Sequence, residues 1–112
     1  MREVYVCSYS RTPIGAFQGS LSSTTSTKLG STTIKSTLEK ASIGSHDVDE
    51  VIMGNVLSAN LGQAPARQAA LGAGLDKNVE CMTINKVCGS GLKSIMLADQ
   101  SLRLGNVKIS IA

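Results

Sequence analysis

Apolar positions along the chain fall into two kinds of run, short ones typical of strands and longer ones with helical spacing. Residues 3–8 and 49–56 are rich in β-branched and aliphatic side chains and are bounded by turn-forming residues, so each is predicted to form a strand. Residues 80–87 form a third run of this kind. Apolar residues alternate again over residues 107–111 and predict a fourth strand that reaches the last residue.

Helical patterns lie between these strands. A helix is predicted over residues 25–42, with Gly44 as its stop, and a second begins at Pro65 and ends near Gly72. A third is predicted over residues 90–104, where apolar residues cover more than half of the circumference and imply burial on several sides. The order β-α-β-α-β-α-β predicts an α/β fold with parallel strands, right-handed crossovers and helices on both faces of the sheet.

Composition narrows the range of functions. The chain has 112 residues, enough for one small domain, and its net charge is +3, with no Lys and Arg cluster of the kind that binds nucleic acid. No apolar run is long enough to span a membrane. Three cysteines without a CxxC pair, and a single histidine, His46, in a polar loop, argue against a zinc site. The first residues resemble neither a secretory signal nor a presequence, so we expect a cytoplasmic protein, with a mitochondrial one as the alternative.

Cys88 stands where the third predicted strand meets the third predicted helix. The first N–H groups of a helix are unpaired and its dipole is positive there, so a thiolate at that position is favoured over a thiol. Gly89 and Gly91 leave room for the close approach of a substrate, and the N–H of Cys88 could face a developing oxyanion. The pattern therefore makes Cys88 the candidate catalytic nucleophile.

Two other interpretations apply to the same segment. A cysteine at the end of a strand is more often a packing residue than a nucleophile, although the neighbouring glycines favour function here. The sequence GSGLKS over residues 89–94 also contains glycines and a lysine, but it lacks the spacing of a phosphate-binding P-loop. Nucleotide binding is therefore not expected.

Residues 85–93, NKVCGSGLK, resemble the nucleophile segment of the thiolases. Further stretches resemble the same family in the same order, so that the resemblance covers nearly the whole chain. These stretches are residues 11–15 (RTPIG), 49–56 (DEVIMGNV) and 62–69 (GQAPARQA). Within the family the chain is most similar to the acetyl-CoA C-acetyltransferases, also called acetoacetyl-CoA thiolases. Related enzymes often carry a capping Asn at the position of Ala64, so the helix start at Pro65 is expected to be slightly weakened.

The resemblance implies a fold and a domain organisation. Residues 1–112 would be the incomplete N-terminal half-domain of a thiolase-like fold with a mainly parallel mixed sheet. The C-terminal domain and the loop domain would lie outside these residues. The helix over residues 90–104 would be a central helix of that fold, covered in the family by the second domain and its loop insertion.

The resemblance also implies a reaction. Cys88 would take an acetyl group from acetyl-CoA, and the carbanion of a second acetyl-CoA would attack acetyl-Cys88 to give acetoacetyl-CoA and CoA, reversibly. In the family the activating His, a second acid/base Cys and an Asn-positioned water come from the C-terminal half. Neither Cys7 nor Cys81 matches the second catalytic cysteine. The isolated chain is therefore expected to be inactive.

Coenzyme A thioesters are substrates in this scheme, and no cofactor or metal is implied. A homodimer or homotetramer is expected for the full-length protein. Three alternatives stay open: a non-catalytic fragment that binds an intact thiolase subunit or is a remnant, a 3-ketoacyl-CoA thiolase of broader chain length, and a ketoacyl synthase, which also uses a Cys at a strand-to-helix turn. The NKVCGSGLK, GNV and GQAPARQAA motifs favour a thiolase over a synthase.

Overall fold

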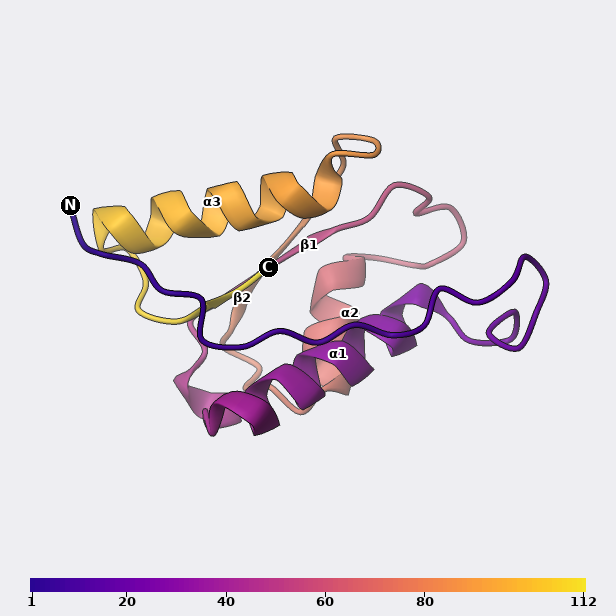
Figure 1. Ribbon diagram of the computed structural model, residues 1–112, viewed down its shortest axis with the longest axis horizontal. Coiled ribbons are helices and arrows are strands. Elements are labelled where there is room, and N and C mark those ends of the chain that lie inside the picture. The colour runs from indigo at the N-terminus through magenta and orange to yellow at the C-terminus, as the bar shows by residue number, and fades with distance from the viewer.

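The computed structural model describes residues 1–112 as three layers, with the sheet between two layers of helices (Figure 1). One helix, α3, covers one face of the sheet, and α1 and α2 cover the other. The elements in chain order are α1 (Ser26–Ala41), the 3-10 turn η1 (Ser45–Asp47), β1 (Glu50–Gly54), α2 (Pro65–Gly72), β2 (Glu80–Ile84), α3 (Ser90–Leu104) and β3 (Ser110–Ile111). None of the helices has the length and apolar character needed to cross a membrane.

All three strands are parallel, in the order β2-β1-β3. The central strand β1 pairs with β2 from Glu50 opposite Glu80 to Gly54 opposite Ile84, and with β3 only at its first two residues. The predicted α/β class, the parallel pairing and the helices on both faces are therefore confirmed. Because β1 and β2 are parallel, their carboxyl ends lie on the same side of the sheet, and the chain passes from the end of β2 to α3 on that side.

The first helix forms as the apolar pattern predicts, although its stop differs. Thr25 caps its start, since the Thr25 hydroxyl accepts a hydrogen bond from the Lys28 N–H at 3.2 Å. The predicted stop at Gly44 is wrong. Ser42 ends the helix instead in the left-handed conformation with φ 55°, and its N–H donates to Glu39 O. Ser therefore takes a position that glycine usually fills.

The second helix begins at Pro65, as predicted, and its alanines pack closely on α1. The Ser31 hydroxyl, buried on α1, donates to Ala69 O at 2.9 Å, and a Cβ on Gly30 would lie only 3.0 Å from the Ala69 Cβ. Ala64 precedes the helix in the left-handed region, with φ 50°, and its side chain makes no capping hydrogen bond. The small residues therefore bring two backbones together. Ala64 supplies no cap to α2, but β2 does, since the Thr83 hydroxyl accepts a hydrogen bond from the Ala66 N–H at 2.9 Å.

The hydrophobic core lies between β1 and the layer of α1 and α2. It is built from aliphatic side chains and alanine, because the chain has few aromatic residues. Its buried members are Ile34, Leu38, Val48, Val51, Ala69, Ala70, Leu75 and Val79.

The predicted strand over residues 3–8 is wrong. The segment forms no ladder with any strand, and β3 has β1 as its only partner. The two ends of the segment are bound to helices instead. The Arg2 N–H donates to Arg103 O of α3, and Lys40 Nζ of α1 donates to Tyr9 O. A strand is defined by ladder hydrogen bonds, so apolar and β-branched composition alone does not produce one here.

One face of α3 is covered by the sheet and the rest is open. Ser94 and Ala98 are buried, whereas Leu92, Ile95 and Met96 are about half exposed or more. The whole chain exposes 7504 Å², against about 5,800 Å² expected for a compact monomer of this mass. The burial of α3 on several sides, which its apolar residues predict, is therefore not reached within residues 1–112.

Candidate functional site

Cys88 lies in the short connection between β2 and α3, two residues before the helix begins, and its side chain is exposed. The strand was predicted to continue to Val87, which is wrong, because β2 ends at Ile84. The helix, in contrast, spans residues 90–104 as predicted. The structure thus places Cys88 at the carboxyl end of the parallel strands and at the start of a helix, and a tight turn separates it from β2.

Hydrogen bonds within the chain shape this turn. The Asn85 side-chain oxygen accepts from the Val87 N–H at 2.8 Å, and the Gly89 N–H donates to Lys86 O at 3.0 Å. The Ser90 hydroxyl accepts from the Lys86 N–H at 2.8 Å and donates to Val87 O at 2.6 Å. Val87 has φ 47°, a left-handed conformation that β-branched residues rarely adopt. Cys88 therefore follows directly on a strained residue.

Gly54, the last residue of β1, supports the turn from below. A Cβ on Gly54 would lie 2.9 Å from the Ser90 Cβ and 2.7 Å from the Ser90 carbonyl carbon, so only glycine allows this approach. Neither Ser90 nor Gly54 is among the site residues predicted from the sequence. The role of Ser90 depends on a turn that forms only in the folded chain, and no sequence signal brings Gly54 to this place.

The N–H of Cys88 has no hydrogen-bond partner within the chain. Apart from its chain neighbours and the backbone of its own helix, no atom lies within 4 Å of the position that a Cβ on Gly91 would occupy. An exposed thiol, an unpaired N–H and open space thus stand together at the start of α3. A carbonyl carbon attacked by such a thiol develops negative charge on its oxygen, which an unpaired backbone N–H can stabilise.

The other cysteines and the histidine lie elsewhere. Cys81 is on β2, partly buried, and its thiol donates to Val79 O; burial raises the pKa of this thiol, and the Arg67 guanidinium partly opposes the rise. His46 lies in η1, exposed, with its Nε2 3.6 Å from an Asp47 carboxylate oxygen. His46 lies before the amino end of β1, whereas Cys88 lies after the carboxyl end of β2. Because the two strands are parallel, His46 and Cys88 lie at opposite ends of the strands.

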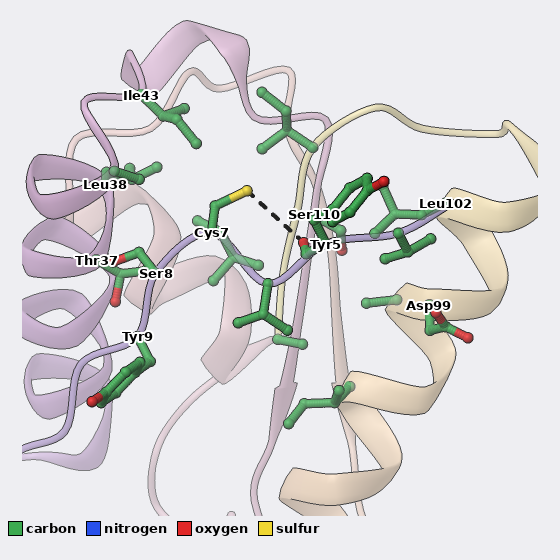
Figure 2. Close-up of a pocket in the computed structure, with 18 of the residues that line it drawn as sticks. Tyr5, Cys7, Ser8, Tyr9, Thr37, Leu38, Ile43, Asp99, Leu102 and Ser110 are labelled. Atoms are coloured by element: carbon green, nitrogen blue, oxygen red, sulfur yellow. Dashed lines mark hydrogen bonds between the residues drawn. The ribbon is translucent and has the colours of Figure 1, made fainter. Parts of the chain in front are cut away.

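A cavity of about 610 Å³ lies away from Cys88, which is not among its lining residues. It lies under the N-terminal segment, between α1, α3 and β3, and its lining is mostly hydrophobic. Figure 2 shows Tyr5 and Cys7 of that segment over the cavity, with Leu38 of α1 and Leu102 of α3 on either side. Cys7 donates weakly to Tyr5 O. The cavity therefore follows the unpaired edge of β3, and the candidate nucleophile lies outside it.

Comparison with known proteins adds a family to this geometry. The family "Thiolase, N-terminal domain" matches residues 4–112. An acetyl-CoA acetyltransferase of Schizosaccharomyces pombe is 56% identical over 98% of this chain, and a mitochondrial one of Xenopus tropicalis is 58% identical over 100% of it. A cytosolic acetyl-CoA acetyltransferase of Gibberella zeae is 57% identical over 97% of the chain.

Among solved structures, the Acat5 thiolase from Ascaris suum in complex with coenzyme A is similar. Its TM-score is 0.93 at 39% sequence identity, and the match covers 95% of this chain and 28% of that one. The chain likewise spans only 27% to 28% of the length of the three curated relatives.

Proposed function

Because this chain belongs to the thiolase family, we propose that it supplies the nucleophile of an acetyl-CoA C-acetyltransferase, with Cys88 as the residue that carries the acetyl group. The observation that supports this role best is the position of Cys88, an exposed thiol with an unpaired N–H at the start of α3. The names of the relatives support acetyl-CoA and coenzyme A as the reactants, so coenzyme A thioesters are substrates in this scheme and no further cofactor is needed.

The proposed reaction has two covalent steps. The Cys88 thiolate attacks the carbonyl carbon of acetyl-CoA, the bond from that carbon to the CoA sulfur breaks, and CoA leaves as a thiol after taking up a proton. A second acetyl-CoA then loses a proton from its methyl group, and the carbanion attacks acetyl-Cys88. A carbon–carbon bond forms, the Cys88 thiolate is released, and acetoacetyl-CoA leaves. Thiolysis of acetoacetyl-CoA is the reverse.

Both steps move protons, and a base must lie within hydrogen-bond reach of the proton that it takes. No side-chain base forms a hydrogen bond to Cys88 in the structure, and His46 lies at the opposite end of the parallel strands. We therefore place the acid/base groups outside residues 1–112. For the same reason, residues 1–112 alone should not catalyse thiolysis.

The test uses the natural protein that contains this chain and follows thiolysis of acetoacetyl-CoA. Cys88→Ala should abolish turnover, whereas Cys7→Ala should retain it. Cys7 is the matched control because both cysteines are free and exposed, so that only their positions in the fold differ. Turnover by the Cys88→Ala protein, or equal loss in both variants, would refute the role of Cys88.

A non-catalytic role is the second candidate, and one observation favours it. The open face of α3 and the edge of β3 are unpartnered within these residues, and surfaces of this kind bind other subunits. The intact mass of the natural gene product separates the two functions. A mass of 11.6 kDa, with copurification of an intact thiolase and no turnover, would favour the binding role. A mass near 40 kDa, about two or three domains, would favour the enzyme.

The assembly and location of the protein follow from the same proposal. We expect the whole enzyme to be a homodimer or homotetramer, which the mass of the native particle tests. The relatives include both cytosolic and mitochondrial proteins. Cell fractionation decides between a cytoplasmic location, which we favour, and a mitochondrial one.

A further inference from the structure

We propose that Ser90 is a positioning residue for Cys88, in that its buried hydroxyl holds the strained turn that presents the nucleophile. This inference rests on the proposed function of Cys88 and adds a residue to it. Ser90 is only 4% exposed, so it does not touch a substrate that reaches Cys88 from solvent. It acts through the backbone of the two residues that precede the cysteine.

The Ser90 hydroxyl joins both sides of the turn. It accepts a hydrogen bond from the Lys86 N–H at 2.8 Å and donates one to Val87 O at 2.6 Å. The Ser90 N–H adds a second bond to Val87 O at 3.1 Å. Ser90 is buried, so removal of its hydroxyl leaves the Lys86 N–H without its partner in the chain.

The conformation of Val87 explains why this bond matters for the cysteine. Val87 is held at φ 47° by Asn85 on its N–H and by Ser90 on its carbonyl oxygen. A β-branched residue stays in that region only where its surroundings hold it there. Without the hydroxyl, the bond to Lys86 is lost and only the Ser90 N–H still reaches Val87 O. Relaxation of Val87 towards negative φ then rotates the next peptide unit, which contains the Cys88 N–H. The direction of both the thiol and the N–H thus depends on Ser90.

The sheet fixes Ser90 in turn. Gly54 at the end of β1 lies so close that a Cβ there would be 2.9 Å from the Ser90 Cβ. The contact with β1 therefore fixes the place of Ser90, and Ser90 in turn fixes the place of the turn before Cys88. A displacement of about 1 Å in a reacting group can lower a rate by about 100-fold. The contacts that hold Cys88 in place should therefore raise the rate of its acetylation.

The experiment compares Ser90→Ala, Ser90→Thr and Ser94→Ala in the natural protein that contains this chain. Ser94 is the matched control: it is also buried on α3, and its hydroxyl donates to Gly91 O at 2.6 Å without reaching the turn. We measure the rate of acetylation of Cys88 by acetyl-CoA and the rate of its alkylation by iodoacetamide, both by peptide mass spectrometry. The kcat and KM of thiolysis are measured in parallel.

Ser90→Ala should lower the acetylation rate and kcat by about 10-fold to 100-fold, with little change in KM. Ser90→Thr, which keeps the hydroxyl, should restore most of the rate, and Ser94→Ala should stay close to the unsubstituted protein. Equal rates in Ser90→Ala and the unsubstituted protein, or equal losses in Ser90→Ala and Ser94→Ala, would overturn the inference. Absence of acetyl-Cys88 in the unsubstituted protein would refute the proposed function instead, and alkylation of Cys88 would still decide the role of Ser90.

A second measurement needs no substitution and covers the outcome in which Ser90→Ala does not fold. Hydrogen exchange in the unsubstituted protein should show the Lys86 N–H protected, since it donates to the buried Ser90 hydroxyl. The Cys88 N–H, which has no partner, should exchange fast. Fast exchange at Lys86 would show that the Ser90 bridge is absent and would overturn the inference.

Discussion

Gly54→Ala is the substitution that tests the packing of the candidate site most sharply. Gly54 ends β1 where it touches the first turn of α3. A Cβ there would lie 2.7 Å from the Ser90 carbonyl carbon and 2.8 Å from the Gly91 nitrogen. Both are backbone atoms, which cannot rotate away as the end of a side chain can. The added methyl group must therefore push the start of α3 away from β1.

The expected cost follows from two opposing effects. Overpacking of this kind costs about 1–3 kcal/mol. Replacing glycine by alanine restricts the unfolded chain and returns about 0.4–1 kcal/mol. Gly54→Ala should therefore lower the free energy of unfolding by about 1.3 kcal/mol, the difference between the mid-values of the two ranges. Urea unfolding measures this change. Because the turn moves with the helix, acetylation of Cys88 should slow as well.

Gly91→Ala is the matched control for stability. Gly91 follows Ser90 in the first turn of α3, but apart from its chain neighbours and the backbone of its own helix no atom is within 4 Å of the position that its Cβ would take. Alanine is favoured over glycine in a helix by about 0.8–1 kcal/mol, so this variant should be as stable as the unsubstituted protein or more so. Equal free energies of unfolding for Gly54→Ala and Gly91→Ala would refute the close contact between β1 and α3.

Two further predictions concern residues outside the site. Ala64 is left-handed with φ 50°. Ala64→Gly removes about 1–2 kcal/mol of backbone strain and loses about 0.4–1 kcal/mol through a more flexible unfolded chain, so it should raise the free energy of unfolding by roughly 0.5–1 kcal/mol. Ala66→Gly, inside α2, should lower it, and urea unfolding that shows a loss in both would contradict the strain at Ala64. The N–H groups of Lys108 and Ile109 donate to the Asp49 carboxylate and hold its pKa below the usual range. The resulting stabilisation is present above the unfolded-state pKa of Asp49 and is lost as the pH falls through the lower folded-state value. In Asp49→Asn, the free energy of unfolding should therefore fall less as the pH is lowered. Urea unfolding at a series of acidic pH values measures this, and the same fall in both proteins would contradict it.

Patterns within single elements predicted most of the fold. The helix over residues 90–104 was predicted with its observed bounds, because its apolar residues and Gly105 are local signals. The strand over residues 3–8 failed for the opposite reason. Its composition suits a strand, but a strand needs a partner, and which segments pair is decided by contacts far apart in the sequence.

The candidate site divides in the same way. Cys88 could be predicted because a strand, two glycines and a helix surround it in the sequence. Ser90 and Gly54 could not, since their roles depend on a turn with a left-handed Val87 and on the approach of β1 to α3. Side-chain bonds to backbone groups and the space that a missing Cβ leaves appear only when the chain is folded.

The role of Cys88 as the nucleophile is tested most directly by locating the acetyl group after one half-reaction. The natural protein that contains this chain is incubated with acetyl-CoA alone, quenched in acid and digested, and the peptides are examined by tandem mass spectrometry. We expect one acetyl group per active site, on Cys88, which is released when free CoA is added. An acetyl group on Cys7 or Cys81 instead, or no acetyl-Cys88 in a protein that carries out thiolysis, would contradict it.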